Sequence, residues 1–534
     1  MSTSSSPRSS LGLSTRGRGL ARAYALAAVV AAGLAGLAWY GLGRPLGVPD
    51  AAPPDGKMQC VSYTPFLRHQ SPLEPFVISR EQVARDFALL SRYFRCVRTY
   101  SVAGLELIPE VAAEQGLEVL LGAWIGPDRE ASAREVEGLV ALANRYPDTV
   151  SAVIVGNEVL LRRERTGEQM VELLRQVKAR VPQPVTYADV WEFWNAHPEV
   201  APAVDFVTIH LLPYWEDEPS GIDRALSQVR RVREEMGRRF AGKPILIGET
   251  GWPSEGRQRE TARPSRENQA RFVRGLVAMA EAEVWSYNLI EAFDQPWKRE
   301  KEGAVGGYWG LFDAERVDKG VLSGPVSNLP GWRGWLALSG VLAAGLLLLA
   351  GPPRSRWGTL APLLAAAGGG LVAYHLQYGT VAARNGAEWA WVGAEAALSL
   401  AATLLFVLRL VAPAGARRAA LLGLAERYAG RLLLALGFTA AVVALQLAFE
   451  PRYRDFPFAV YLVPALGFLS STMAGGTGPA RPPLRWLGAL LALAAPVVVY
   501  RETFVNGPAM AWVAVSLLLA LALLWPGRRS PAPT

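Results

Sequence analysis

Two glutamates in this chain each follow a run of strand-forming residues, in the manner of a catalytic pair. Residues 153–158 read VIVGNE and residues 245–253 read ILIGETGWP, so Glu158 and Glu249 each end such a run. In a parallel (β/α)8 barrel, the carboxyl ends of the strands form the catalytic face. Two carboxylates facing each other there can cleave a glycosidic bond, because one protonates the leaving oxygen and the other attacks or activates water. The sequence therefore predicts a carbohydrate-active enzyme.

The elements that position these glutamates are predicted by alternating strand-like and helix-length amphipathic segments between residues 58 and 320. This alternation indicates βα units and a parallel sheet. The predicted strands span residues 60–64, 96–100, 118–125, 151–155, 185–188, 204–210, 244–248 and 284–290. Eight such units fit an α/β fold of the (β/α)8 or TIM-barrel type. Glu158 then follows the fourth strand and Glu249 the seventh.

The same segments resemble a known family. Residues 248–254, GETGWPS, look like the signature of glycoside hydrolase family 17, the β-1,3-glucanase family, and Gly156-Asn157-Glu158 matches its acid/base segment. Residues 287–298, YNLIEAFDQPWK, and residues 310–313, GLFD, resemble the segment after its last strand. The resemblance covers residues 58–315 and implies a retaining barrel enzyme that acts on β-1,3-glucan. It makes Glu249 the nucleophile and Glu158 the acid/base.

Substrate contacts follow partly from the resemblance and partly from position. The resemblance implies that Asn157 hydrogen-bonds the sugar beside the scissile bond. Aromatic rings at strand ends can pack against pyranose C–H groups, and polar groups there can bind hydroxyls. The other candidates are Tyr100, His210, Tyr214, Trp252, Asp294, Trp297 and Lys298, with Trp191, Trp194 and Trp215 as weaker ones. Barrel packing, or a solvated loop position for Lys298, is the alternative reading of these side chains.

The acidic groups near the last strand depart from the family pattern. Plant relatives have a further acidic residue where this chain has Gln295, while Glu291 and Asp294 lie nearby. This departure concerns glucan contacts rather than catalysis. For the acid/base, we expect burial and the charge of Glu249 to raise the pKa of Glu158, since it must be protonated to expel the leaving group.

Histidine and cysteine usage argues against a metal site. The four histidines are scattered singly and the chain has only two cysteines, so the sequence predicts no metal and no cofactor. Cys60 and Cys96 are expected at the beginnings of the first two strands, which should be neighbours. A disulfide is permitted outside the cytoplasm. Two buried thiols in adjacent strands are the alternative.

The composition changes sharply near Pro330, after which Leu, Ala, Val and Gly dominate. Apolar stretches long enough to span a bilayer predict one transmembrane anchor at 24–42 and a seven-helix region at 333–526. The seven spans are 333–350, 358–377, 389–408, 432–449, 457–474, 486–500 and 508–525. Residues 1–23 and 527–534 are then tails, and 43–57, with Pro53 and Pro54, form a linker to the barrel at 58–320. A cleaved signal peptide is the alternative for 24–42.

Basic residues in the short loops predict the orientation. Those expected inside are Arg16, Arg18, Arg22, Arg354, Arg356, Arg409, Arg417, Arg418, Arg427, Arg431, Arg481, Arg485, Arg528 and Arg529. Eight spans return both tails to the cytoplasm and place the barrel outside, on the periplasmic side of a bacterial inner membrane. These loops account for much of the net charge of +8, which therefore needs no nucleic-acid partner.

The predicted function is remodelling of extracytoplasmic β-glucan, with transfer favoured over hydrolysis because bacterial relatives fused to membrane helices resemble glucan transglycosylases. A processing subunit of a glucan export complex is a further hypothesis, and a sugar-binding pseudoenzyme is disfavoured by the two intact glutamates. The inside loops are too short for a glycosyltransferase domain, and Arg485-Trp486 lacks the Gln-x-x-Arg-Trp pattern. The expected partners are β-glucan, the lipid bilayer and a separate glucan synthase. Glu395, His375 and Gln446 lie within predicted spans, where an ionisable residue suggests a function or a polar helix contact.

Overall fold

The computed structural model describes residues 15–51, 53, 56–412, 414–474 and 482–525. The chain divides into two compact units, one formed by Pro45–Asn328 and one by the residues before and after it. Most of the expected first tail, the whole of the last tail, Pro54 and Arg481 lie outside the described residues.

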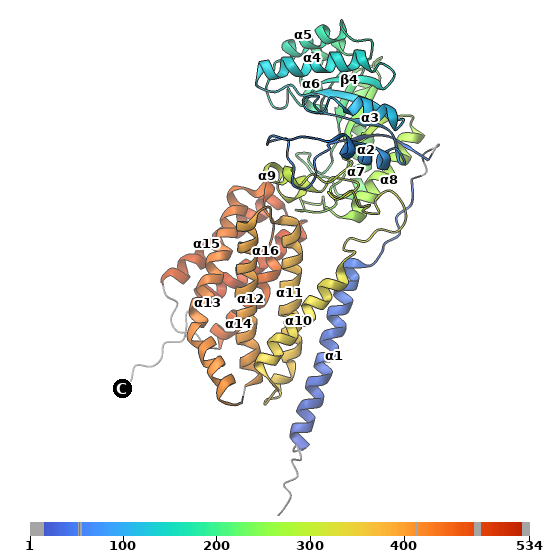
Figure 1. The fold of residues 1–534 in the computed structure, drawn as a ribbon. Helices are drawn as coiled ribbons and strands as arrows, with labels where there is room; N and C mark the ends of the chain where they lie inside the picture. Colours follow the sequence, from blue (N-terminus) through green and yellow to red (C-terminus); the bar gives the residue numbers. More distant parts are fainter. Residues whose placement is uncertain (1–14, 52, 54–55, 413, 475–481, 526–534) are drawn as a thin grey trace, which may run out of the picture. The chain divides into compact units, whose positions relative to one another are not determined.

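The unit Pro45–Asn328 contains a closed barrel of eight parallel strands in sequence order (Figure 1). The strands are β1 (Met58–Ser62), β2 (Phe94–Arg98), β3 (Glu118–Ala123), β4 (Val150–Asn157), β5 (Val185–Val190), β6 (Val207–His210), β7 (Ile245–Thr250) and β8 (Ser286–Leu289). Each strand is hydrogen-bonded to the next, and β8 pairs with β1. The predicted (β/α)8 TIM-barrel fold is confirmed.

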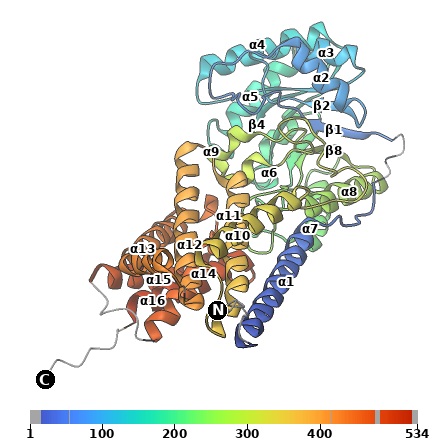
Figure 2. The same ribbon diagram turned by 60° about the horizontal axis from the view of Figure 1, so that its bottom comes forward.

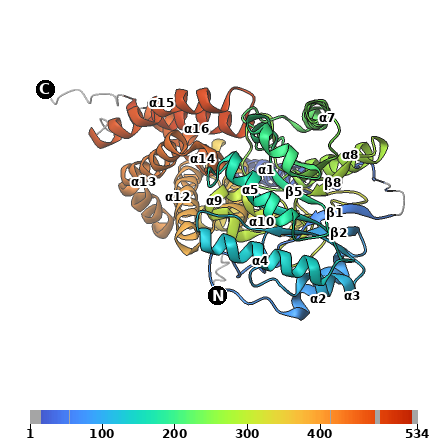
Figure 3. The same ribbon diagram turned by 90° about the horizontal axis from the view of Figure 1, so that it is seen from above.

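Helices surround the strands, as Figure 3 shows for α2, α3, α4, α7 and α8. The helices are α2 (Arg80–Leu90), α3 (Ile108–Glu114), α4 (Arg129–Arg145), α5 (Gly167–Lys178), α6 (Trp191–Ala196), α7 (Ile222–Arg239) and α8 (Arg266–Ala282). Short helices η1 (Pro198–Ala203), η2 (Pro296–Lys298), α9 (Arg299–Glu302) and η3 (Ala304–Gly307) lie in the connections. Side chains of Ser79, Asp128, Thr166 and Ser265 cap α2, α4, α5 and α8 by accepting backbone N–H groups. Each cap accepts a backbone N–H group of the first turn that has no partner within the helix, and so defines where the helix begins.

The strands alternate between an inward and an outward layer. Inside the barrel, Cys60, Cys96, Leu120, Ile154 and Leu246 belong to one apolar cluster. The outward residues pack with the helices in a larger core. Because the period of a strand is two, the inward series on each strand continues to the catalytic end of the barrel.

The close approach of β2 and β3 requires a glycine. A Cβ at Gly122 would overlap the backbone carbonyl oxygen of Thr99. A side chain here would therefore push apart the two strand ends that the site uses. Val284, which the sequence placed in the last strand, instead lies in a turn with φ +54° and is 90% exposed, so β8 begins at Ser286.

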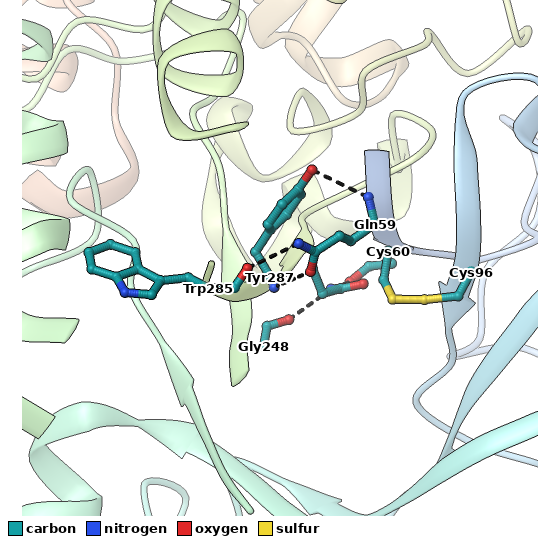
Figure 4. Close-up of a disulfide and its surroundings, with 8 residues drawn as sticks. Gln59, Cys60, Cys96, Gly248, Trp285 and Tyr287 are labelled. Atoms are coloured by element: carbon teal, nitrogen blue, oxygen red, sulfur yellow. Dashed lines mark hydrogen bonds between the residues drawn. A yellow bond between two sulfur atoms is a disulfide. The ribbon is translucent and has the colours of Figure 1, made fainter. Parts of the chain in front are cut away.

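Cys60 and Cys96 occupy the same level of β1 and β2 and form a disulfide, with their Cα atoms 4.6 Å apart (Figure 4). Each is the third residue of its strand rather than the first. Beside the disulfide, Gln59 joins β1 to β8 by donating to Trp285 O at 3.0 Å and accepting from Tyr287 N at 3.0 Å (Figure 4). These bonds fix the two strands that close the barrel at its amino-terminal end.

The expected linker is in part packed against the barrel. Leu46 pairs with Val326 in an antiparallel bridge. Arg274 of α8 donates to Val48 O at 2.7 Å and to Asp50 Oδ1 at 2.9 Å. The barrel unit thus begins before and ends after the expected 58–320, because both connecting segments are hydrogen-bonded to it.

The second unit is helical, and α11–α16 lie side by side in it (Figures 1 and 2). Its helices are α1 (Thr15–Gly43), α10 (Trp332–Ala350), α11 (Ala361–Ala382), α12 (Gly386–Val411), α13 (Ala416–Phe449), α14 (Phe458–Met473), α15 (Pro482–Glu502) and α16 (Gly507–Leu524). Among the described residues, seven helices are long and apolar enough to cross a membrane. The remaining expected span, 457–474, corresponds to α14, which is apolar but shorter, with 16 residues between Pro457 and Ala474.

Two features of this unit differ from the expectation or extend it. Helix α13 begins at Ala416, before the expected span at 432, because the basic segment ahead of that span is itself helical.

Within the unit, Glu395 Oε1 accepts hydrogen bonds from Trp391 Nε1 at 3.0 Å and Tyr461 OH at 2.7 Å. His375 Nε2 lies 3.2 Å from Glu395 Oε2. The two hydrogen bonds from Trp391 and Tyr461 thus satisfy one oxygen of a carboxylate that is only 2% exposed, and His375 lies beside the other.

Candidate active site

Glu158 and Glu249 face each other at the carboxyl ends of β4 and β7. Glu158 immediately follows β4, is half-buried and has φ +53°, in the left-handed region. Glu249 lies within β7 and is 5% exposed. One carboxylate oxygen of each lies within 4.8 Å of the other. This proximity allows both to act on one bond of a bound substrate.

His210, the last residue of β6, lies between the two glutamates. Its Nδ1 is 3.0 Å from Glu158 Oε1, and its Nε2 is 3.6 Å from Glu249 Oε1. The ring is 1% exposed, so both contacts are shielded from water. His210 therefore lies close to both carboxylates at once.

The ionisation of Glu158 differs from the sequence-based expectation. Burial acts to raise its pKa, but the hydrogen bond and charge of His210, with the charges of Arg162 and Arg98, outweigh burial and lower the pKa below its ordinary value. The expected rise was wrong for the free site because it took account of Glu249 but not of the cations. Ionised Glu158 is therefore favoured before substrate enters.

Tyr100 and Arg98 hold the Glu249 carboxylate. Tyr100 OH donates to Glu249 Oε1 at 2.9 Å, and Arg98 Nη1 lies 3.4 Å from the same oxygen. A chain of hydrogen bonds orients the tyrosine, because Asn288 Nδ2 donates to Ser62 Oγ at 2.8 Å and this hydroxyl is 2.8 Å from Tyr100 OH. Donors aimed at one carboxylate oxygen fix the position of the Glu249 side chain.

Arg98, which the sequence did not single out, is the central cation of the site. It is fully buried in the barrel, and its guanidinium donates to Gly248 O and Asn157 Oδ1, both at 2.6 Å. It thereby ties β2 to the segments that contain both glutamates. Asn157, 8% exposed at the end of β4, is held by this bond. The available signal was that Arg98 precedes Tyr100 by two positions and so shares its inward face.

Two buried ion pairs lie after β8. Lys298 Nζ donates to Glu291 Oε2 at 2.7 Å, so Lys298 is not a solvated loop lysine. Lys319 Nζ donates to Asp294 Oδ1 at 2.9 Å, and burial raises the pKa of Asp294 to about 7 although Lys319 opposes the rise. Asp294 also accepts from Gly310 N at 2.9 Å. The contacts of Asp294 are those of a residue that organises the loop.

The remaining aromatic candidates pack rather than line an open surface. Tyr214 and Trp252 are fully buried, and their polar atoms donate to Arg257 O and Arg263 O. Trp297 is half-buried and its Nε1 donates to Gln295 Oε1 at 2.8 Å. Packing, the alternative for these rings, accounts for their contacts. Trp191 and Trp215 are half-buried and Trp194 is buried.

Glu158, His210 and Glu249 also have the spacing of a metal-binding group. The sequence predicts no metal here. Two carboxylates that act on one glycosidic bond need the same proximity, so the spacing does not require an ion.

Comparisons with known proteins bear on the barrel half of the chain. Residues 60–310 match the family model described as the BtgE/BtgC glycoside hydrolase domain. A glucan 1,3-beta-glucosidase of Arthroderma benhamiae is 29% identical over 256 residues, which covers 44% of this chain and 82% of the relative. The protein of the same name from Saccharomyces cerevisiae is 26% identical over 254 residues, covering 42% and 80%.

Among solved structures, an active-site mutant of the Rhizomucor miehei beta-1,3-glucanosyltransferase in complex with laminaritriose is similar. It is 25% identical, with a TM-score of 0.45, over 50% of this chain and 96% of that chain. The family match itself rests on residues 60–310, which correspond to the BtgE/BtgC glycoside hydrolase domain.

Proposed function

We propose that this protein is a membrane-anchored, retaining enzyme that acts on β-1,3-glucan, with Glu249 as nucleophile and Glu158 as acid/base. One observation carries the proposal: the two carboxylates face each other from β4 and β7, with oxygens within 4.8 Å. Retaining glycosidases hold their carboxyl groups about 5–5.5 Å apart, whereas inverting enzymes leave room for a water between them. The fungal relatives named as glucan 1,3-beta-glucosidases support the substrate class.

In the first step, Glu249 attacks the anomeric carbon while the glycosidic bond breaks and Glu158 protonates the departing oxygen. The hydrogen bonds from Tyr100 and Arg98 orient Glu249 for this attack. In the second step, Glu158 takes a proton from the incoming hydroxyl, which displaces Glu249 from the sugar. Because His210 lowers the pKa of Glu158 in the free site, the protonated acid is most abundant at acidic pH.

Transfer is the outcome we propose, with a sugar hydroxyl rather than water attacking the glycosyl-enzyme. A barrel tethered beside a membrane suits the modification of an emerging polymer supplied by a separate synthase. Hydrolysis is the second candidate, because the fungal relatives are named as glucosidases. Both outcomes share the first step.

The experiment is to incubate the full-length protein in detergent with a β-1,3-gluco-oligosaccharide and to identify the products. Longer or newly linked products establish transfer, and shorter products alone establish hydrolysis. The anomer first released, followed by NMR, tests retention. Glu249→Gln and Glu158→Gln should be inactive, whereas Glu137→Gln, which removes only an exposed ion pair with Arg180 on the barrel surface, should leave turnover unchanged.

We also propose that α1 and the helices after the barrel span the bacterial cytoplasmic membrane and place the barrel on its outer side. The apolar length of the helices supports this proposal. Arg354 and Arg356 in the short loop after α10 support the orientation, because short loops rich in basic residues stay on the cytoplasmic side. Trp39 Nε1 donates to Ser339 Oγ at 2.9 Å, so α1 packs on α10, which favours a retained anchor over a cleaved signal. Alkaline phosphatase fused after residue 353 should be inactive and after residue 384 active; the reverse pattern refutes the orientation.

A further inference from the structure

Trp124 is an exposed aromatic residue at the catalytic end of the barrel that the mechanism above does not use. It directly follows β3, and 41% of it is exposed. Leu120 on the same strand points into the barrel. By the period of two, Gly122 and then Trp124 continue this inward series to the mouth. Part of this indole is therefore not covered by the rest of the protein, and it can contact a ligand at the mouth of the barrel.

The backbone of Trp124 is firmly held. Its N–H donates to Glu135 Oε2 at 3.1 Å, and Glu135 is 7% exposed. The same carboxylate accepts from Val102 N and Ala103 N, both at 3.0 Å. These bonds join the end of β3 to the loop after β2, so the position of the indole is set by buried contacts. A platform held in this way loses little conformational entropy when a ligand binds.

One face of the indole is occupied by a cation. The Arg162 guanidinium carbon lies 4.3 Å from the ring centroid of Trp124. Arg162 is itself fixed, because it donates to Asn157 O at 2.5 Å and to Ile125 O at 3.1 Å. The cation is attracted by the π-electrons and orients the ring. Arg162 thus holds one face of the Trp124 ring and also contacts Asn157, the residue before Glu158.

The position of Trp124 relates it to one side of the scissile bond. β3 is paired with β4, at whose end Glu158 lies, whereas β7 with Glu249 pairs with β6 and β8. Glu158 protonates the oxygen that belongs to the departing sugar, so that sugar must lie on the Glu158 side of the mouth. Trp124 lies on this side. In the second step the same place receives the acceptor sugar.

We propose that Trp124 is the stacking platform for the sugar ring on the leaving-group side, and that it favours transfer by holding an acceptor glucosyl unit there. The inference rests on the proposed function and names the acceptor subsite of that site. The C–H face of a pyranose packs on the indole, and an acceptor hydroxyl faces the anomeric carbon. Its oxygen forms the new bond, its proton goes to Glu158, and the electron pair of the broken ester bond returns to Glu249.

The test uses β-laminaribiosyl fluoride, a donor that occupies only the nucleophile side because its leaving group is a single fluoride. The full-length protein in detergent is assayed for fluoride release without acceptor, and then for transfer to added laminaribiose. Trp124→Ala should keep fluoride release within about twofold of wild type, and the acceptor concentration for half-maximal transfer should rise about tenfold. Trp124→Phe should restore part of the transfer, and Trp124→Leu should not. Trp357→Ala, which removes another exposed tryptophan outside the barrel unit, is the matched control and should behave as wild type.

Three results from the variants would overturn the inference. If Trp124→Ala and wild type need the same acceptor concentration for half-maximal transfer, Trp124 is not the stacking platform. A parallel loss of fluoride release and transfer assigns Trp124 a structural role in positioning Glu158. Equal rescue by leucine and phenylalanine shows that apolar volume, rather than a ring, is what the acceptor needs. Absence of fluoride release by the folded wild type instead refutes the proposed function, whereas release without acceptor-dependent transfer refutes only transfer and the platform.

Discussion

Replacing Arg98 by lysine keeps the buried charge but removes the fork that joins three strands. In the wild type, Nη1 and Nη2 donate to Gly248 O and Asn157 Oδ1, each at 2.6 Å, and Nη1 lies 3.4 Å from Glu249 Oε1. A lysine ammonium carries its three donors on one nitrogen at the end of a shorter side chain, so it cannot reproduce the two-nitrogen fork that bonds both acceptors. A buried acceptor left without its donor costs about 1–3 kcal/mol.

Working from these contacts, we expect Arg98→Lys to lower the free energy of unfolding of the barrel by about 2–4 kcal/mol, since one acceptor is lost and the Glu249 carboxylate is less well compensated. Catalysis should suffer more than stability. Asn157 and Glu249 would both be free to shift, and a displacement of about 1 Å in a reacting group costs about 100-fold in rate. The expected kcat/KM is therefore lower by about that factor.

The assay is pulse proteolysis of the full-length protein in detergent over a urea series, which reports unfolding of the barrel, together with kcat/KM on a β-1,3-gluco-oligosaccharide. Arg80→Lys is the matched control, because Arg80 also contacts two acceptors, Glu110 and Glu114, but is 43% exposed in its side chain. It should cost less than about 1 kcal/mol. An Arg98→Lys protein that unfolds and turns over like this control would refute the assigned role of the guanidinium.

Three further predictions concern other parts of the barrel. His210→Gln removes the histidine that contributes most to lowering the pKa of Glu158, so this pKa rises and the alkaline limb of kcat/KM moves to higher pH, because the acid stays protonated further; an unmoved limb contradicts this. The double substitution Cys60→Ser and Cys96→Ser opens a link across 36 residues and should lower the free energy of unfolding by about 3–4 kcal/mol, as should reduction of the wild type; urea midpoints unchanged in both would contradict it. Gly122→Ala forces a Cβ onto a backbone carbonyl and should cost about 1–3 kcal/mol in the same unfolding assay, and a neutral effect would show that the strands can separate freely.

The barrel could be predicted from sequence because its signals are local. Alternating apolar runs predict strands, and a glutamate at the end of such a run must lie at the same face as every other strand end. Tyr100 and His210, which the sequence placed at strand ends, lie beside the two glutamates for this reason. Val284 could not be placed in the same way, because an apolar residue before a strand looks the same in sequence whether it pairs in the sheet or lies in a turn.

The electrostatics of the site could not be predicted in the same way. Arg98 is an arginine in an apolar run, and its partners Gly248 and Asn157 lie far from it in sequence. The direction of the pKa shift of Glu158 depends on the hydrogen bond and charge of His210 and on the charges of Arg162 and Arg98, which oppose burial. Such proximity arises only when the barrel closes, so no local pattern contains it.

The left-handed backbone at Glu158 has an evolutionary consequence. With φ +53°, this position holds a side chain in a conformation that glycine adopts freely and that costs other residues about 1–2 kcal/mol. Mutation of Glu158 to glycine would therefore stabilise the fold, and only selection for catalytic activity opposes this mutation. Lineages in which the barrel has lost its substrate should drift at Glu158 before they drift at Glu249, whose strand backbone carries no such cost. A descendant that keeps glutamate at position 158 thus records continued use of the site.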